Sequence, residues 1–304
     1  MEYMLETNNL SKLYRKVTVL DELSMHVPKG SIYGLVGRNG AGKTTLIRII
    51  CGLQEPTSGK YTICGIQNSD RKISRARRRM GAVVETPSIY LDLSARENIF
   101  QQYRILGIPS DDGAGQLLHL VGLDGIGEKK VKNFSLGMRQ RLGIAIALAG
   151  NPDLLVLDEP INGLDPQGII EIRELILKLN REQGITVLIA SHILDELSRL
   201  ATHYGFIDNG KIIKEISADV LEKVSQKCIR VEASNLPGLA RVLDELGADY
   251  RISSNSTADI YSKIQVTEFA MNAAKEGCAI ISMVENDESL ESFYLNLMGG
   301  EHNA

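Results

Sequence analysis

Gly37-Arg38-Asn39-Gly40-Ala41-Gly42-Lys43-Thr44 matches G-x-x-x-x-G-K-[ST], the pattern of a phosphate-binding loop, at every specified position. The stretch Ser31–Val36 runs into this loop as a predicted strand, and a predicted helix follows over about Thr44–Leu53. The glycines allow backbone N–H groups to turn inward around phosphate oxygens, and the helix N-terminus adds its positive dipole. Strand, loop and helix in this order therefore predict a nucleotide-phosphate site.

Within this loop, Lys43 is expected to place its positive charge on the β- and γ-phosphates of ATP. The Thr44 hydroxyl is expected to hold Mg²⁺. The remaining nucleotide contacts are predicted at Gly37, Asn39, Gly40, Ala41, Gly42 and Thr45.

A second strand, Leu154–Leu157, is apolar throughout and ends in the acids Asp158 and Glu159. A buried parallel strand delivers its C-terminal residues to the ligand crevice of the sheet. Asp158 is then the expected Mg²⁺ partner, and Glu159 is expected to take a proton from the attacking water. The alternative is an acidic helix cap before Pro160.

A third apolar strand, Thr186–Ser191, ends at His192. A lone histidine at a strand end is more often structural. Beside the two motifs above, a neutral His192 ring is expected to contact the γ-phosphate or the water. The other histidines are interpreted as structural or surface residues: His26, His119, His203 and His302.

The chain is predicted to form two domains, residues 1–215 and 216–304. In the first, β-branched runs alternate with helical patterns, which indicates a mainly parallel α/β sheet opened by short strands at about Met4–Asn8 and Leu20–Val27. Residues from about 86 to 150 read as an inserted helical subdomain, with helices over Ala95–Leu106, Gly115–Val121 and Leu136–Ala149.

The second domain follows the order βαββαβ, which is that of a ferredoxin-like α+β sheet. A helix over about Pro237–Leu246 is followed by a predicted hairpin, and Thr267 is the expected N-cap of a second helix. The predicted strands are Cys228–Ala233, Tyr250–Ser253, Ile260–Lys263 and Cys278–Val284, and a last helix covers about Ser289–Met298.

Composition narrows the classes of function. The 304 residues carry a net charge of −4, which argues against a nucleic-acid partner. The run Arg75–Arg79 lacks interleaved aromatics and is interpreted as a solvated helix face. No stretch approaches the roughly 20 apolar residues of a membrane span, and the N-terminus lacks a signal-peptide pattern. Four scattered cysteines indicate reduced thiols, so the protein is predicted to be cytosolic.

Together these motifs resemble those of ABC-transporter nucleotide-binding domains over about residues 1–215. Asn133-Phe134-Ser135-Leu136-Gly137-Met138 resembles the family signature L-S-G-G-Q, in which Ser135 and Gly137 match. The resemblance implies that these two residues serve the ATP held by the opposite subunit. Asn162–Asp165 resembles the D-loop that crosses the dimer interface, and Tyr14 occupies the place of the aromatic residue that stacks on adenine.

One position departs from the family. The strand Met80–Val84 ends in Glu85, where the family carries a glutamine that touches Mg²⁺ and opens the loop to the membrane subunit. Glu85 is therefore expected to be a metal ligand. This exchange, with Phe134–Met138 and Glu159–Pro166, resembles the bacitracin- and lantibiotic-export and self-immunity subfamily.

The resemblance implies a P-loop ABC-type fold and an ATP-hydrolysing motor subunit that uses ATP and Mg²⁺. It implies two partners: an integral membrane permease, and a second cassette in a homodimer or a pair of related subunits. The permease would hold the protein at the inner face of the cell membrane. The alternative is a soluble ABC ATPase of translation or DNA repair, but this chain has one phosphate loop and no long coiled-coil insertion.

Overall fold

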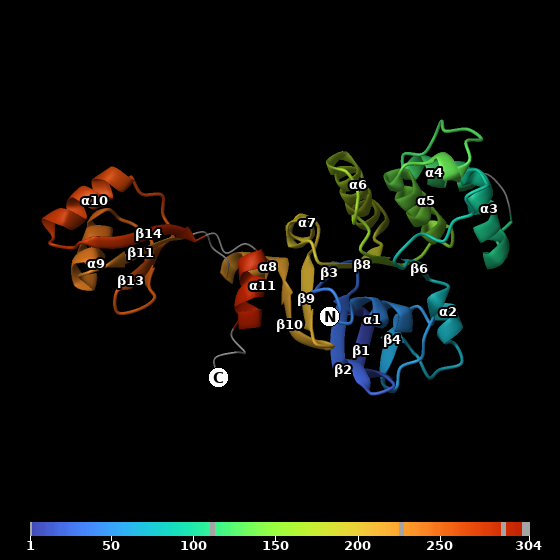
Figure 1. The fold of residues 1–304 in the computed structure, drawn as a ribbon, viewed down its shortest axis with the longest axis horizontal. Coiled ribbons are helices and arrows are strands. Elements are labelled where there is room, and N and C mark those ends of the chain that lie inside the picture. The colour runs from blue at the N-terminus through green and yellow to red at the C-terminus, as the bar shows by residue number, and fades with distance from the viewer. Residues whose placement is uncertain (1, 110–112, 225–227, 287–289, 300–304) are drawn as a thin grey trace. The chain divides into compact units, whose positions relative to one another are not determined.

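The computed structural model describes residues 2–109, 113–224, 228–286 and 290–299 (Figure 1). The chain divides into two compact units, the N-terminal unit Met1–Ala218 and the C-terminal unit Asp219–Ala304. The boundary expected from the sequence, between residues 215 and 216, falls within β10 (Lys211–Ser217), which pairs with β9 (His203–Asp208) of the N-terminal unit.

The central element of the N-terminal unit is a six-stranded sheet with the order β10-β9-β3-β8-β7-β6. All its neighbours run parallel except β10, which returns antiparallel to β9 through a tight turn. The mainly parallel sheet that the sequence predicts is therefore confirmed. Its other strands are β3 (Ile32–Val36), β6 (Met80–Val83), β7 (Leu154–Asp158) and β8 (Thr186–Ser191).

A second, antiparallel sheet with the order β2-β1-β4-β5 was not expected. The predicted opening strands were too short, because β1 and β2 form a long hairpin in which Tyr14 pairs with Val17. The turn between them uses Arg15 at φ 55°, and no glycine or asparagine marks it in the sequence. The strands are β1 (Tyr3–Tyr14), β2 (Val17–Pro28), β4 (Ser58–Ile63) and β5 (Ile66–Gln67).

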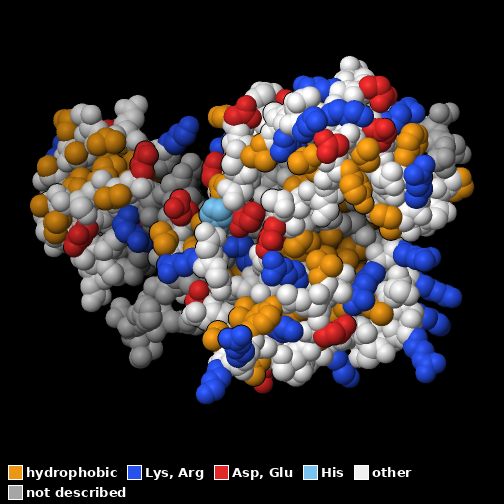
Figure 2. Space-filling view, turned by 45° about the vertical axis from the view of Figure 1, so that its right-hand side comes forward, with side chains coloured by type: hydrophobic (Ala, Val, Ile, Leu, Met, Phe, Trp, Pro, Cys, Tyr) orange, Lys and Arg blue, Asp and Glu red, His pale blue; other side chains and the backbone are white. Residues whose placement is uncertain are grey.

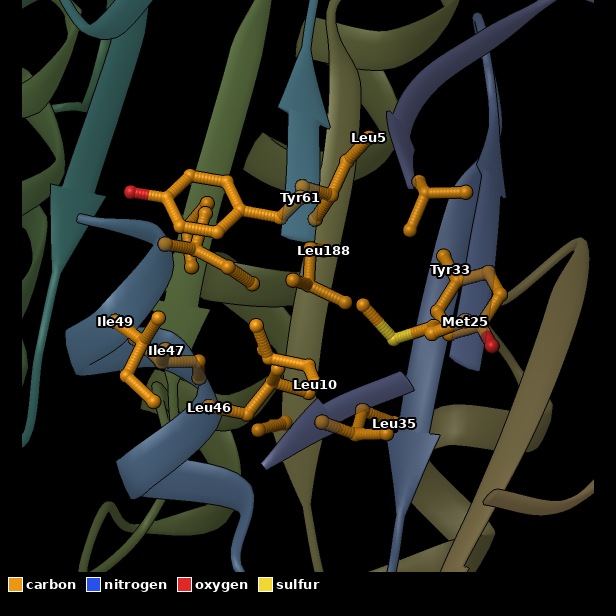
Figure 3. Packing of buried hydrophobic residues seen from close by; sticks show 14 of the residues in the cluster. Leu5, Leu10, Met25, Tyr33, Leu35, Leu46, Ile47, Ile49, Tyr61 and Leu188 are labelled. Atoms are coloured by element: carbon orange, nitrogen blue, oxygen red, sulfur yellow. The ribbon is translucent and has the colours of Figure 1, made fainter. Parts of the chain in front are cut away.

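Helix α1 (Lys43–Ile50) joins the two sheets into one core (Figure 3). Its Leu46 and Ile47 belong to the same buried cluster as Leu10 of β1 and Leu188 of β8. Burial of such side chains contributes roughly 1.5–3 kcal/mol each. The phosphate-binding loop therefore stands on a helix that is held from both sides.

The helical subdomain contains α3 (Ala95–Leu106), α4 (Gly113–Leu120) and α5 (Leu136–Leu148), as expected. Helix α3 begins with a capping box between Ser94 and Glu97 and ends at Gly107 in the left-handed conformation. The remaining helices of this unit are α2 (Ile73–Arg77), the 3₁₀ turn η1 (Val131–Asn133), α6 (Pro166–Gln183) and α7 (Leu194–Ser198).

After α8 (Ala218–Val224), the C-terminal unit has the predicted ferredoxin-like order, with strands arranged β12-β13-β11-β14. Thr267 is not the N-cap of the second helix; Gln265 is, and Thr267 lies inside the first turn. Ser289 and His302 lie outside the described residues. The elements are β11 (Cys228–Ala233), α9 (Leu236–Glu245), β12 (Tyr250–Ile252), β13 (Thr257–Ile260), α10 (Val266–Lys275), β14 (Ile280–Asn286) and α11 (Leu290–Gly299).

Candidate nucleotide-binding and hydrolysis site

The phosphate-binding loop is shaped by two glycines that no other residue could replace without strain. A Cβ atom on Gly37 would lie 2.5 Å from the carbonyl oxygen of Ile207. Gly42 has φ 110° and faces the backbone of β2 at Val19. It is also the N-cap of α1 and offers no capping side chain, so the first N–H groups of the helix remain available for an anion.

Lys43 is 6% exposed, and its ammonium lies within the curve of the loop. It donates to the carbonyl oxygens of Gly37 at 2.7 Å and Arg38 at 3.3 Å. Thr44 and Thr45 follow it on α1 and are half-buried. The Lys43 ammonium, held here by two carbonyl oxygens and lying 3.4 Å from Glu159 Oε1, can move to phosphate oxygens, which bind an ammonium more strongly than neutral carbonyls do.

The strand register brings the predicted acidic residues to the loop. Val36 of β3 pairs with Ser191 of β8, and Asp158 of β7 pairs with Ala190. The three strands are parallel, so their carboxyl ends meet at one edge of the sheet, beside the loop. Sequence segments more than 100 residues apart thus converge on one site.

Asp158 is 1% exposed, and neither carboxylate oxygen has a hydrogen-bond partner of good geometry. Burial raises the pKa of this carboxyl above its usual value; the negative charges of Glu159 and Glu85 add to the effect, while the Thr44 hydroxyl and Lys43 oppose it. A buried carboxylate without partners requires a compensating charge. Together with the Thr44 hydroxyl it offers the hard oxygen ligands that Mg²⁺ prefers, so these residues fit that ion.

Glu159 lies between Lys43 and His192. Its Oε1 is 3.4 Å from the Lys43 ammonium, and its Oε2 is 2.9 Å from His192 Nδ1. The backbone at Glu159 is left-handed, with φ 49°, and its N–H donates to the Ala190 carbonyl. The structure therefore brings together Lys43, Asp158, Glu159 and His192, all of which the sequence nominates.

Glu85, the metal ligand expected from the sequence, forms an ion pair with Arg48. Its carboxylate lies 2.5 Å from the Arg48 guanidinium, and its side chain is 54% exposed. Its backbone is left-handed, with φ 60°. Its charge still reaches Asp158, whose pKa it raises. The ion pair with Arg48 connects the end of β6 to α1, and a role of Glu85 at the metal stays a prediction.

Tyr14 stands at the end of the β1–β2 hairpin and is 38% exposed. Its hydroxyl donates to Gln54 Oε1, and the Lys12 ammonium lies 5.2 Å from the ring centroid. The hairpin is anchored to the phosphate loop, because Gly42 faces Val19 and Leu20 of β2. Stacking of adenine on this ring stays a prediction.

The signature residues lie at the start of α5. Ser135 is the N-cap, and its hydroxyl accepts from the Met138 N–H at 3.2 Å. Leu136 is 52% exposed and faces Gly163 of the D-loop, where a Cβ atom would lie 3.3 Å from Leu136 Cδ2. Within the described ranges, no hydrogen bond or ion pair joins Ser135 or Gly137 to the phosphate loop of the same chain.

Sequence reasoning missed Arg48 and Gln54. Arg48 is five residues beyond Lys43, in a helix whose neighbours are apolar, and only its basic character in the last turn was visible. Gln54 follows the helix at a distance of 40 residues from Tyr14. Neither contact leaves a local pattern, because each depends on which strands become neighbours.

No helix in the described part of the chain has the length and apolar character needed to cross a membrane. A family model described as ABC transporter matches residues 20–162. The chain is 40% identical over 304 residues to the bacitracin transport ATP-binding protein BcrA of Bacillus licheniformis, covering 99% of both chains. It is 46% identical over 223 residues to the lantibiotic transport ATP-binding protein SrtF of Streptococcus pyogenes, covering 73% of this chain and 95% of that one.

Among solved structures, the chain resembles the dimeric ATP-binding cassette MJ0796 bound to ADP and Pi, with a TM-score of 0.64 and 26% identity. The match covers 71% of this chain and 99% of that chain. The alternative of a translation or DNA-repair ATPase finds no support in these relatives. The nucleotide site and the similarity along the whole chain together place this protein in the family of ABC-transporter ATP-binding subunits, the ATPases that power transport.

Proposed function

We propose that this subunit powers the export of an antimicrobial peptide and so protects the cell that carries it. Two relatives with similarity along nearly the whole chain, the bacitracin transport proteins, support this substrate class, and the linearmycin resistance protein LnrL of Bacillus subtilis, at 31% identity, supports a role in self-protection. The lantibiotic transport protein SrtF supports the substrate class over 73% of this chain.

Binding of ATP would begin at the phosphate loop. The N–H groups of the loop and of the first turn of α1 surround the phosphates, and Lys43 exchanges its carbonyl partners for phosphate oxygens. Thr44 and Asp158 would hold Mg²⁺, which supplies positive charge to the phosphate oxygens. The residues Gly37, Asn39, Gly40, Ala41, Gly42 and Thr45 complete the contacts.

Hydrolysis would use Glu159 as the general base. Its carboxylate takes a proton from water, the water oxygen bonds to the γ-phosphorus, and the bond to the bridging oxygen breaks to give ADP and inorganic phosphate. The contact of His192 Nδ1 with Glu159 holds the carboxylate in place and leaves Nε2 for the γ-phosphate.

A second cassette would complete the site. Ser135 and Gly137 make no contact with their own phosphate loop in the described residues, and Leu136 beside them is exposed. These features suit a signature that binds the nucleotide of a facing subunit. Whether the second cassette is identical or related, the phosphate loop of each subunit would face the signature of the other.

A membrane permease would dock at the cleft that begins at Glu85. This cleft has a volume of about 440 Å³ and is lined by residues from α1, α2, β6, α3 and α5. It includes Arg48, Glu85 and Pro87, so a partner seated there would touch the ion pair that leads to the phosphate helix. Docking would hold the subunit at the cytoplasmic face of the membrane.

The observation that carries the ATP-hydrolysing part of the proposal is the buried Asp158 carboxylate, which lacks a well-formed hydrogen bond, beside the Lys43–Glu159–His192 contacts. Cells that express the wild-type protein together with its membrane partner should resist a bacitracin- or lantibiotic-class peptide, and Glu159→Gln should abolish that resistance while the complex still assembles. Co-purification of an integral membrane protein tests the partner directly. Full resistance in Glu159→Gln cells would contradict the proposal.

A further inference from the structure

The segment around α2 is the most basic part of the described surface. Between Asp70 and Arg79 the chain has six basic residues and one acidic residue, although its net charge is −4. Five of these side chains are exposed, and four of the five form no ion pair with a described residue: Arg71, Lys72, Arg75 and Arg78. We call these four residues the basic strip.

The two remaining basic residues of the segment are used within the fold. Arg77 donates to the Tyr61 hydroxyl at 2.5 Å, and Arg79 pairs with Asp153 at 2.5 Å. The basic strip differs from them, because its side chains form no ion pair with any described residue. The segment therefore carries four cationic side chains that no described carboxylate neutralises.

The positive charges of the basic strip repel one another, and burial of α2 in the core does little to offset this repulsion. Arg75 lies within α2 and Arg78, three residues later, is its C-cap, so these two lie on one face of the helix, whereas Arg71 precedes it. Like charges at this spacing repel one another and destabilise a helix. Only Ala76 of α2 is fully buried, so the helix contributes little to the core. An external anion would relieve this repulsion.

The position of the strip suggests which anion. Arg77 and Arg78 line the cleft that also contains Glu85 and Pro87, where the permease is proposed to dock. The strip therefore borders the side of the subunit that faces the membrane. Lys and Arg side chains project from the right-hand edge of the molecule in Figure 2, the side on which Figure 1 places α2.

We propose that the basic strip binds the anionic headgroups of phospholipids in the leaflet next to the permease. This inference rests on the proposed docking at the Glu85 cleft, which orients the strip. Clusters of four to eight basic residues beside a membrane-spanning segment attract anionic lipids. Each basic residue near the surface contributes roughly a fivefold factor to the membrane partition coefficient. Four exposed cations without ion-pair partners on the side proposed to face the membrane match an anionic lipid surface in charge and in position, and a contact with an acidic protein segment is an outcome of the test.

The test uses the full-length chain and vesicles of phosphatidylcholine with or without about 30% phosphatidylglycerol, without permease. Wild-type protein should sediment with the anionic vesicles at about 50 mM salt and should be released as the Debye length shortens at higher salt. Lys72→Glu/Arg75→Glu should weaken this partition by at least about 25-fold. The matched control, Lys178→Glu/Arg181→Glu on α6, makes the same change in net charge and should retain most of it.

Three results would overturn the proposal. These are no binding of wild-type protein to anionic vesicles, equal binding to neutral vesicles, and equal loss in the control variant. A strip variant that binds vesicles normally but loses the permease in neutral nanodiscs would show a protein contact instead. If Lys72→Glu/Arg75→Glu melts below the parent, Lys72→Gln/Arg75→Gln replaces it. Failure of the export function would appear in the resistance assay, which is independent of these vesicles.

Discussion

Asp158 ends β7, is buried, and is proposed to hold Mg²⁺. Burial raises its pKa in the folded protein, so the ionised carboxylate is disfavoured on folding at every pH above the pKa of the unfolded chain. The cost is fully present above the raised folded pKa and disappears as pH falls below the unfolded value of about 3.9. The proposed Mg²⁺ site would need the charged carboxylate that burial disfavours.

We therefore expect Asp158→Asn to raise the melting temperature at pH 7 by a few degrees in the absence of Mg²⁺ and nucleotide. The same variant should lose on the order of 10²-fold or more of its Mg²⁺-dependent ATPase rate, because a metal supplies several kcal/mol of charge stabilisation. Thermal melts from pH 4 to pH 8 check this: the gap between the variant and the parent should shrink toward pH 4. A lower melting temperature at pH 7 would contradict it.

The Arg48–Glu85 ion pair links the phosphate helix to the proposed permease cleft. Both side chains are more than a third exposed, so the pair contributes at most about 1 kcal/mol to folding. We expect the pair to matter for export because it connects the end of β6 to α1. We expect Arg48→Ala and Glu85→Ala to leave ATP affinity within a few-fold of the parent but to reduce export strongly, with Glu85→Gln milder.

The double variant Arg48→Glu/Glu85→Arg provides the control, because it restores the attraction with the charges exchanged. ATP affinity, the ATPase rate of the isolated subunit and peptide export should be compared in all four proteins. If the exchanged pair recovers export, then export requires the attraction between residues 48 and 85 and not the identity of either side chain. Full export by either alanine variant would show that the pair is only a solvated surface contact.

At the scale of elements, helix α5 packs so closely on β6 that a methyl group would not fit between them. A Cβ atom on Gly81 would lie 2.2 Å from the carbonyl oxygen of Ala147, which is backbone and cannot turn away. We expect Gly81→Ala to destabilise the N-terminal unit by about 1–3 kcal/mol. Gly115→Ala on α4 is the matched control, since its Cβ would meet only Arg96 Nη2 at 3.4 Å.

Thermal or denaturant unfolding measures both glycine variants. Alanine is better than glycine in a helix by roughly 0.5–1 kcal/mol, so Gly115→Ala should be neutral or slightly stabilising. The prediction fails if the two variants unfold alike. A large effect at Gly81 alone would show that the close approach of α5 and β6 is a rigid feature of the subdomain contact.

The β1–β2 hairpin is the second element with a specific expectation, because it presents Tyr14. Stacking of a base on an aromatic ring contributes on the order of 1–3 kcal/mol. Tyr14→Ala should therefore weaken ATP binding by about tenfold or more, while Tyr14→Phe should lose only the contact with Gln54. The chain contains no tryptophan, so Tyr14→Trp supplies a fluorescence reporter for titration. Unchanged affinity in Tyr14→Ala would reject the assignment.

At the scale of the whole molecule, one chain holds a phosphate loop and a signature that do not meet. Glu159→Gln should keep the nucleotide contacts but lose the base, which slows hydrolysis by roughly 10²- to 10⁴-fold. ATP should then hold two subunits together, and sedimentation should show a dimer that the parent forms only transiently. Glu159→Gln/Lys43→Ala should stay monomeric. A Glu159→Gln protein that remains monomeric at saturating ATP would exclude this pairing.

Much of the site was predictable from the sequence because its parts are locally encoded. The glycine spacing of the phosphate loop, the acids that end β7 and the histidine after β8 each stand at a boundary that hydrophobic patterning reveals. Parallel strands bring such boundaries to one edge, so Lys43, Asp158, Glu159 and His192 could be assigned to one site before any coordinates. The βαββαβ order of the C-terminal unit could also be predicted, because local hydrophobic patterning marks its strands and helices.

Tertiary structure alone decided the features that depend on which distant segments become neighbours. The antiparallel sheet β2-β1-β4-β5 joins strands separated by more than 40 residues, and its first turn lacks the residues that usually mark one. The pairing of Glu85 with Arg48 depends on β6 ending beside α1, and the missing partners of Asp158 depend on its complete burial. Local sequence determines what each segment can do, whereas long-range packing determines which charges meet, because electrostatic partners are chosen by distance in space.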